Sequence, residues 1–300
     1  MRRLLILAAL LFFLLPSFGC GQKRGAFDGQ KAFAELERQV SFGPRFPGSA
    51  GHDRCLDYLV TTLRGYTDDV RQQSFTFTYG PERVTAKATN VVARFGPGGN
   101  PRLLLCAHWD TRPWADRDPN PANRQKPILG ANDGASGVAV LLELARVMHT
   151  RPPRQGVVIV LFDAEDEGVE GDDDSYAIGS KFYAEHLPET ERPEFGILLD
   201  MVGDADLNLY QEGYSLTYAK AYVDLVWQTA QQLGYPEFIP RAQYYVVDDH
   251  VRLLKVGVPC IDIIDFDYPY WHTLQDTPDK CSAASLEKVG RVLEHVIYGY

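Results

Sequence analysis

The stretch that most constrains the fold is VVIVLFDAEDEG, residues 157–168, in which an apolar run ends in a cluster of acids. An uninterrupted run of Val, Ile and Leu is typical of a strand buried on both faces, as in the parallel part of an α/β sheet. Such sheets bind ligands just beyond the carboxyl ends of their strands. We therefore expect Glu165 and Asp166 at a functional site, where a metal ion is the simplest partner for two adjacent acids.

Strand-like and helix-like segments alternate from Arg102 to the C-terminus. Apolar runs and alternating patterns predict strands at 75–79, 90–95, 102–107, 157–162, 195–199 and 258–264. Apolar residues three or four positions apart predict helices around 33–40, 56–63, 138–148, 222–233, 250–256 and 286–296. This order predicts an α/β fold, a three-layer α/β/α sandwich around a mixed, mostly parallel central β-sheet, with antiparallel strands at its N-terminal edge.

The first twenty residues have the features of a secretory signal rather than of the folded domain. Two arginines precede an apolar run over residues 4–15, which is short for a membrane span. The sequence SFGC that follows resembles a bacterial lipobox, which would make Cys20 a lipid anchor and residues 21–26 a tether; a simple cleaved signal is the alternative. We expect an exported protein, periplasmic or anchored to the outer membrane as a lipoprotein, with one catalytic domain over residues 27–300.

Composition and cysteine positions narrow the classes of function. The formal net charge is −10, which argues against nucleic acid as a partner because phosphate binding relies on clustered Lys and Arg. Besides Cys20, four cysteines are spread along the chain, where one disulfide bridge or four buried free thiols are both compatible with the pattern. None stands beside a candidate base, so a cysteine nucleophile is not expected.

Potential metal ligands follow four of the predicted strands. These strand-end residues are His108 and Asp110, Glu165 and Asp166, Asp200, and His272, and Asp133 adds a position in the loop GANDGASG. Any one of them alone is more often a cap, turn or surface residue. Together they combine imidazole with carboxylates, which is the ligand mix of a catalytic zinc site rather than of a closed structural one.

The motifs AHWDTRP, GANDGASG, FDAED, LLDMVG, DDHVRLLKVGVP and WHTLQDTPD resemble, in this order, those of the zinc-dependent superfamily that contains the di-zinc aminopeptidases and the animal-type glutaminyl cyclases. The resemblance implies that Asp133, Asp166 and His272 hold one zinc ion and that Glu165 is the general acid/base. It implies a second zinc at His108 and Asp200 in an aminopeptidase, whereas in a cyclase Asp200 is a hydrogen-bonding acid.

Several features of the sequence resemble the cyclase branch. They are Trp271 directly before the histidine ligand, the doubled acid Asp248-Asp249, the LLDMVG string and the DSYAIGS segment. The HTLQDTPDK string is instead peptidase-like, Asp166 replaces the usual Glu, and residues 168–171 lack the aromatic residue of animal cyclases. Residues 172–174 are read as a solvated acidic loop, with a calcium site as the alternative.

The resemblance thus predicts a zinc-dependent glutaminyl-peptide cyclotransferase that acts on peptide or protein N-termini. Its expected catalytic residues are Glu165, Asp200 and Asp248, and its expected substrate-binding residues are Trp271 and Trp109. The alternatives are a di-zinc aminopeptidase and a non-enzymatic surface binding lipoprotein. One zinc ion is expected for the cyclase and two for the aminopeptidase.

Overall fold

The computed structural model describes residues 26–80 and 83–299 of the chain, so the predicted signal, Cys20 and almost all of the tether lie outside the described residues. Its strands are β1 Val70–Tyr79, β2 Val84–Phe95, β3 Leu103–His108, β4 Val157–Phe162, β5 Phe195–Asp200, β6 Leu209–Gln211, β7 Phe238–Ala242 and β8 Cys260–Ile264. Its α-helices are α1 Gly29–Val40, α2 Ala50–Arg64, α3 Ala135–Thr150, α4 Ile178–Glu185, α5 Gly213–Tyr218, α6 Lys220–Leu233, α7 Asp249–Lys255 and α8 Ala283–Tyr298. Within the described residues, none of the helices combines the length and apolar character that a membrane span requires.

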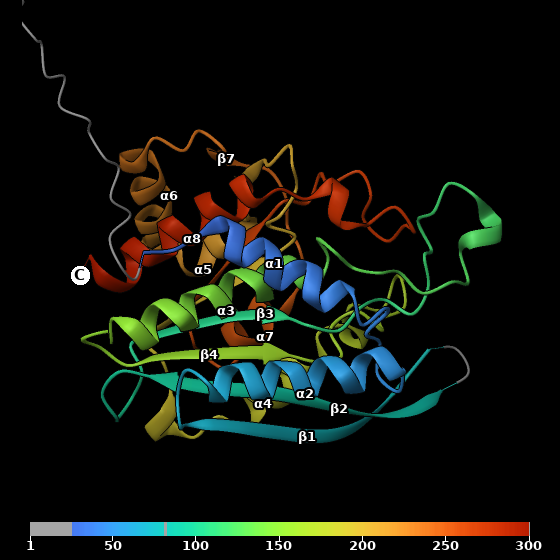
Figure 1. The fold of residues 1–300 in the computed structure, drawn as a ribbon, viewed down its shortest axis with the longest axis horizontal. Helices are drawn as coiled ribbons and strands as arrows, with labels where there is room; N and C mark the ends of the chain where they lie inside the picture. The colour runs from blue at the N-terminus through green and yellow to red at the C-terminus, as the bar shows by residue number, and fades with distance from the viewer. Residues whose placement is uncertain (1–25, 81–82, 300) are drawn as a thin grey trace, which may run out of the picture.

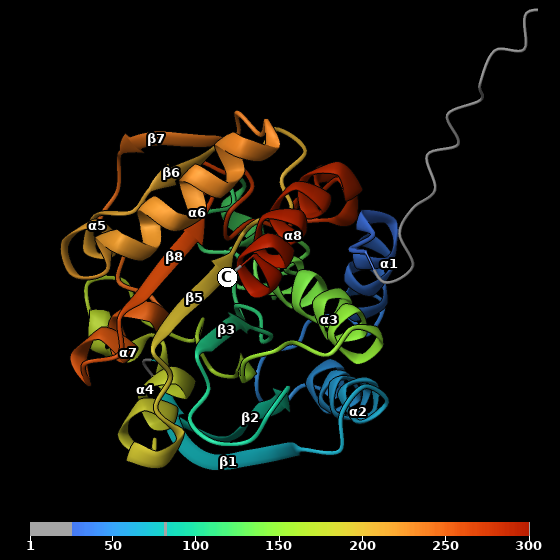
Figure 2. The same cartoon turned by 90° about the vertical axis from the view of Figure 1, so that its left-hand side faces the viewer.

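Six strands form the central sheet in the order β1-β2-β4-β3-β5-β8 (Figure 2). Strands β4, β3, β5 and β8 are parallel neighbours, and β2 pairs antiparallel with both β1 and β4. This arrangement confirms the predicted mixed, mostly parallel sheet with antiparallel strands at its N-terminal edge. It also brings the carboxyl ends of the four parallel strands to one edge.

Helices cover both faces of the sheet (Figures 1 and 2). On one face, α1, α2, α3, α6 and α8 pack over alternate strand residues such as Leu105, Ile159 and Ile197 in the larger buried core. On the other face, α4 and α7 pack over the intervening strand residues, among them Leu104 and Val158. Because successive strand residues point to opposite faces, an all-apolar strand fills both cores, and the predicted α/β/α layering is confirmed.

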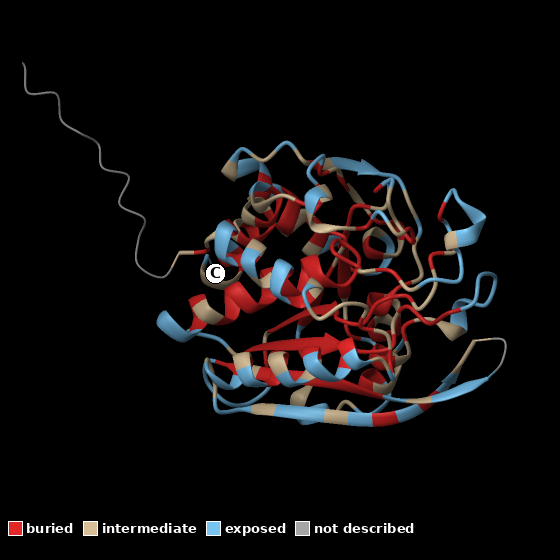
Figure 3. Ribbon diagram, turned by 45° about the vertical axis from the view of Figure 1, so that its right-hand side comes forward, coloured by how far each residue is buried: buried red, intermediate tan, exposed pale blue. Residues whose placement is uncertain are grey.

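Burial follows the same layering, with β3 and β4 fully buried and much of the edge strand β1 exposed (Figure 3). Helices α1, α2 and α7 are capped by Asp28, Ser49 and Asp248, whose side chains accept backbone N–H groups of the first turn. The four cysteines of the described residues are buried and free, so none of them forms a disulfide bridge.

Sequence patterns did not predict β6, β7 and α5. They are three to six residues long, and β6 and β7 pair in parallel as a separate two-stranded sheet. Segments this short contain too few residues for a hydrophobic period to emerge. Of these three elements, α5 packs against β8, and its residue Tyr214 lines the cavity described next.

Candidate functional site

The site lies at the carboxyl ends of the parallel strands, as the strand-end acids predicted. His108 and Asp200 are the last residues of β3 and β5, and the acid pair 165–166 follows β4. Neighbouring parallel strands end side by side, so residues almost a hundred positions apart in sequence meet there. The structure brings six of the predicted residues to this edge: His108, Asp133, Glu165, Asp166, Asp200 and His272.

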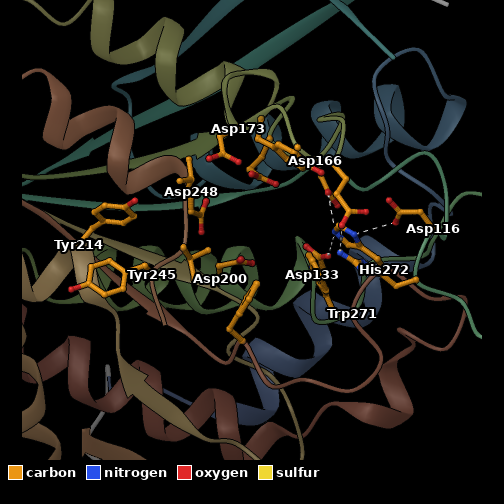
Figure 4. A pocket seen from close by; sticks show the side chains of 18 residues that line it. Asp116, Asp133, Asp166, Asp173, Asp200, Tyr214, Tyr245, Asp248, Trp271 and His272 are labelled. Carbon is orange, nitrogen blue, oxygen red and sulfur yellow. Dashed lines mark hydrogen bonds and ion pairs between the residues drawn. The ribbon is translucent and has the colours of Figure 1, made fainter. Parts of the chain in front are cut away.

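Two groups of potential metal ligands share Asp133. In the first, His272 Nε2 lies 3.2 Å from Asp166 Oδ1 and 3.7 Å from Asp133 Oδ2. In the second, His108 Nε2 lies 3.1 Å from Asp133 Oδ1 and 3.3 Å from Asp200 Oδ1. Figure 4 shows the first group together at one end of the cavity. The two carboxylate oxygens of Asp133 therefore face different histidines, as a bridging ligand would.

The first group fits a zinc ion. Zinc binds imidazole nitrogen and carboxylate oxygen at about 2.0–2.2 Å in tetrahedral geometry, which places its ligand atoms about 3.3–3.6 Å apart. The separations around His272 bracket this range. In addition, the buried Oδ2 atoms of Asp133 and Asp166 have no hydrogen-bond partner, and an acceptor in that state requires a proton or a cation. Burial, followed by the charge of Asp166, raises the pKa of Asp133 to about 7, which reflects the same need for a positive partner.

Two residues that sequence analysis did not select hold the ligands of this group in place. Asp116 Oδ1 lies 3.2 Å from His272 Nδ1, on the side of the ring opposite to the metal-facing nitrogen. Arg112 donates from Nη2 to Asp116 Oδ2 at 2.6 Å and from Nη1 to the Asp166 carbonyl oxygen at 2.9 Å. Arg112 and Asp116 thus connect two ligands that lie far apart in sequence. Burial alone would raise the pKa of Asp166, but His272 and Arg112 hold it below its usual value.

Asp110 has a supporting position rather than a place in either ligand group. Its Oδ2 accepts the backbone N–H groups of Glu165 and Asp166, both at 3.1 Å. Its Oδ1 lies 3.7 Å from His108 Nδ1. The H-x-D spacing of the sequence placed it at the strand end correctly, and its partners show that it orients the acid pair and a histidine.

The ligand-bearing turns have an unusual backbone. Ala164, Met201 and His272 have φ values of 59°, 47° and 55°, in the left-handed region that residues other than glycine seldom occupy. Ala164 directly precedes Glu165, and Met201 directly follows Asp200. Conformations of this kind persist where the surrounding structure fixes them, and they concentrate at functional sites. Here they turn the ends of the strands sharply so that the acids point into the cavity.

Glu165 lies in the cavity as a half-buried carboxylate. Burial raises its pKa well above the usual value, and the negative charge of Asp248 raises it further. Burial and then the charge of Asp200 likewise raise the pKa of Asp248 to about 7. Carboxyls with raised pKa values can both accept and release protons near neutral pH, which is what a general acid/base must do. This environment fits the role predicted for Glu165.

The cavity has a volume of about 360 Å³ and a partly aromatic wall. The Trp271 ring lies over that of His272, with centroids 3.9 Å apart, and Phe266 packs against Trp271 at 5.3 Å. Tyr176 also lines the cavity, and its ring lies so close to Gly168 that a Cβ atom there would be 2.2 Å from it. Tyr176 therefore places an aromatic ring beside the segment in which the sequence shows none.

Trp109 is a correction to the sequence-based expectation. It was predicted to bind substrate, but its side chain is fully buried in the core. The indole stacks on His52 with centroids 4.4 Å apart, and its N–H donates to the Thr89 carbonyl oxygen. The residue next to a strand-end ligand points away from the cavity, so Trp109 stabilises the packing of α2 and β2 against the strand instead.

Behind Asp248 lies a further buried group of titratable side chains. Asp248, His250 and Asp262 offer ligand atoms within 4.8 Å of one another, and His250 Nε2 also lies 3.2 Å from Glu212 Oε2. Glu212 accepts the backbone N–H groups of Tyr214 and Ser215 as the N-cap of α5. This polar layer fixes the start of α7, and with it Asp248, relative to α5.

The acidic segment at residues 172–174 is exposed, in agreement with a solvated loop. Asp174 forms ion pairs with Arg252 and Lys255 at 2.9 and 3.7 Å. Among the described residues, the groups with metal-ligating geometry do not include this segment. The loop therefore contributes to the rim of the cavity through its backbone and Asp173.

Comparison with known proteins identifies similar chains. Residues 90–297 match the model of peptidase family M28. The crystal structure of Tannerella forsythia glutaminyl cyclase is 42% identical, covers 92% of this chain and 99% of its own, and has a TM-score of 0.88. A Zn-dependent exopeptidase from Parabacteroides distasonis is 37% identical, covers 91% and 99%, and also has a TM-score of 0.88. The glutaminyl-peptide cyclotransferase of the snake Boiga irregularis is 23% identical over 85% of this chain and 77% of its own.

Proposed function

This chain belongs to peptidase family M28, and from that premise we propose that it is a zinc-dependent glutaminyl-peptide cyclotransferase. It converts the N-terminal glutamine of peptides and proteins to pyroglutamate and releases ammonia. Its similarity to the glutaminyl cyclase of Tannerella forsythia supports this activity. The observation that favours it most within the molecule is that Glu165, Asp248 and Trp271 share one small cavity with the zinc-fitting group.

Cyclisation needs help at both reacting groups, because an amide is a poor electrophile and ammonia a poor leaving group. A zinc ion held by Asp133, Asp166 and His272 would polarise the side-chain amide oxygen of the substrate glutamine and stabilise the negative charge that develops there. Glu165 accepts a proton when the α-amine attacks the amide carbon. Glu165 then gives this proton to the side-chain amide nitrogen as the bond between that nitrogen and the amide carbon breaks. Ammonia therefore leaves as a neutral molecule, and the Glu165 carboxylate is regenerated.

The other cavity residues position the substrate. Asp248 and Asp200 lie between the two ends of the cavity, where they can accept hydrogen bonds from the substrate amine and the departing nitrogen (Figure 4). Trp271 forms the wall against which the glutamine side chain folds toward its own amine. Because the nucleophile and the electrophile belong to one residue, this positioning supplies much of the rate and no activated water is needed.

One zinc ion suffices for this reaction. In a cyclase, Asp200, whose Oδ1 lies 3.3 Å from His108 Nε2, would act as a hydrogen-bonding acid and not as a metal ligand. The alternative is a di-zinc aminopeptidase, which the second ligand group of His108, Asp133 and Asp200 favours. There a second zinc would sit within that group, and Glu165 would act as the base of a water molecule. A non-enzymatic role is disfavoured because the ligands of both groups are retained and brought together.

We also propose that the protein acts outside the cytoplasm, held to the membrane through a lipidated Cys20. The support is the sequence of residues 1–20, with two arginines, an apolar run and the lipobox-like SFGC. Substrates would then be exported proteins with an N-terminal glutamine. Mass spectrometry of the mature N-terminus, together with fractionation of the Cys20→Ala variant, tests this location. A wild-type protein released unlipidated would refute the anchor.

A coupled assay on the purified domain distinguishes the two activities. Ammonia is followed from a glutamine-initiated peptide, and free amine is followed from aminoacyl chromogenic substrates, each with and without a zinc chelator. A cyclase releases ammonia, leaves the peptide bonds intact and loses its activity on chelation. Stepwise release of N-terminal residues would refute the cyclase and favour the aminopeptidase.

A further inference from the structure

The catalytic cavity extends beyond the zinc-fitting group. Its zinc-fitting group lies at one end, two tyrosines, Tyr214 and Tyr245, lie at the other, and Asp200 and Asp248 stand between (Figure 4). The zinc-fitting residues at one end, Asp133, Asp166 and His272, are buried, whereas Tyr245 at the other end is 71% exposed. A peptide whose first residue reacts between these ends therefore leaves the cavity past the two tyrosines.

Tyr245 is exposed but held in a fixed orientation. A Cβ atom on Gly213 would lie 2.5–2.6 Å from the Tyr245 ring, so the ring packs directly on the backbone there. Tyr214 supports it from the side, in a T-shaped contact with centroids 5.2 Å apart and planes at 86°. This packing is possible only because residue 213 is a glycine and has no side chain. The result is an aromatic ring that is oriented in advance, with most of its surface open to solvent.

The catalytic cavity, which Tyr245 lines, has a neighbouring cavity on the far side of Tyr214 and Val247. A second cavity, with a volume of about 650 Å³, shares Gly171, Asp173, Tyr214 and Val247 with the catalytic cavity. Within the described residues, the exposed large hydrophobic side chains are Val84, Val169, Tyr218 and Tyr245. Tyr245 lines the catalytic cavity, and Tyr218 lines the second cavity. An exposed aromatic ring held at the open end of a catalytic cavity is suited to contact a ligand that enters there.

We propose that Tyr245, supported by Tyr214, is the subsite for the side chain of the second substrate residue, and that this subsite favours an aromatic side chain. The inference rests on the proposed function, since the first residue must be the glutamine that reacts. Stacked and edge-to-face aromatic contacts are worth about 0.5–1.5 kcal/mol beyond the buried area. Because each factor of ten equals about 1.4 kcal/mol, the preference should be about two- to twelvefold.

Dipeptide amides test the subsite directly. We expect kcat/KM for ammonia release from Gln-Phe-NH₂ to exceed that from Gln-Ala-NH₂ by about two- to twelvefold. Tyr245→Ala should bring the ratio close to one, whereas Tyr245→Phe should preserve it because the ring remains. Tyr218→Ala is the matched control, because this tyrosine is also exposed, at 65%, but lines only the second cavity and not the catalytic one. Near-unchanged melting temperatures would show that the variants are folded.

The other outcomes overturn the inference. Equal efficiencies for the two substrates, or a preference that survives in Tyr245→Ala, would show that the second side chain does not bind there. A stronger preference for Gln-Lys-NH₂, lost in Asp173→Asn, would show that the acidic rim selects the substrate instead. If none of the glutamine substrates releases ammonia, the proposed activity itself is wrong, which is a different result from an active enzyme without selectivity.

Discussion

Replacing Asp116 by asparagine should weaken zinc binding although Asp116 is not a ligand. Its two oxygens serve two side chains: Oδ1 lies 3.2 Å from His272 Nδ1 and accepts from Arg112 Nε at 2.9 Å, and Oδ2 accepts from Arg112 Nη2 at 2.6 Å. Burial alone would raise the pKa of Asp116, but the hydrogen bonds from His272 and Arg112 lower it, so this residue is an ionised acceptor at neutral pH. Asparagine has one acceptor oxygen and no charge, and leaves one donor without its partner.

The size of the expected loss of zinc affinity follows from the hydrogen bond that Asp116→Asn removes. A hydrogen bond to a charged group contributes about 1.5–3 kcal/mol, and loss of a carboxylate that orients a ligating histidine typically lowers metal affinity by about 10–100-fold. We expect a zinc Kd raised by about that factor, measured by competition with a chromogenic chelator at neutral pH. The kcat of the zinc-saturated variant should change less than the Kd.

Asp173→Asn is the matched control, since it removes one charge from the exposed rim of the same cavity. It should leave the zinc Kd nearly unchanged. An Asp116→Asn variant that binds zinc as tightly as the wild type would refute the reasoning. Equal weakening in both variants would also refute it, because the effect would then come from overall charge and not from the orientation of His272.

Three further predictions concern catalysis, metal content and stability. Glu165→Gln should keep fold and zinc while kcat falls by about 10²–10⁴-fold, and wild-type rates would exclude its acid/base role. His272→Ala should lose zinc, and full metal content by elemental analysis would mean that the ligand set is wrong. Burial alone would raise the pKa of Glu212, but hydrogen bonds from His250 and from the Ser215 N–H hold it below the usual value. This carboxylate therefore stabilises the fold above pH about 4.3, and that contribution is lost as pH falls through its lowered pKa. Glu212→Gln should lower the melting temperature at pH 7 by an amount that corresponds to about 1–3 kcal/mol and shrinks at acid pH; a pH-independent difference would contradict this.

Local sequence was enough to predict the layers and the position of the site. The apolar runs at 102–107, 157–162 and 195–199 can be buried only in a covered sheet, and parallel strands must end at the same edge. Ligand candidates placed directly after those runs, such as His108 and Asp200, were therefore expected to meet. The structure brings them together, and their roles as ligands or catalytic acids stay predictions.

Residues that act through distant partners could not be predicted in this way. Arg112 and Asp116 lie in a long loop whose composition gives no periodic signal, and the ligands that they contact, Asp166 and His272, are 54 and 156 positions away in the chain. Trp109 is the opposite case, a residue that the sequence placed in the cavity and the structure places in the core. Its place beside a ligand made it look like a cavity residue, but only its contacts with His52 and Thr89 determine which way the ring points.

By itself, the sequence determined the six strands of the central sheet, the acids at their ends and the family of zinc enzymes that the chain resembles, because these depend on local pattern. Only the tertiary structure decided which side chains support the ligands and which aromatic rings line the cavity. Tyr176 and Tyr245 enter the wall because Gly168 and Gly213 leave room for their rings, and a contact of that kind exists only after the chain has folded.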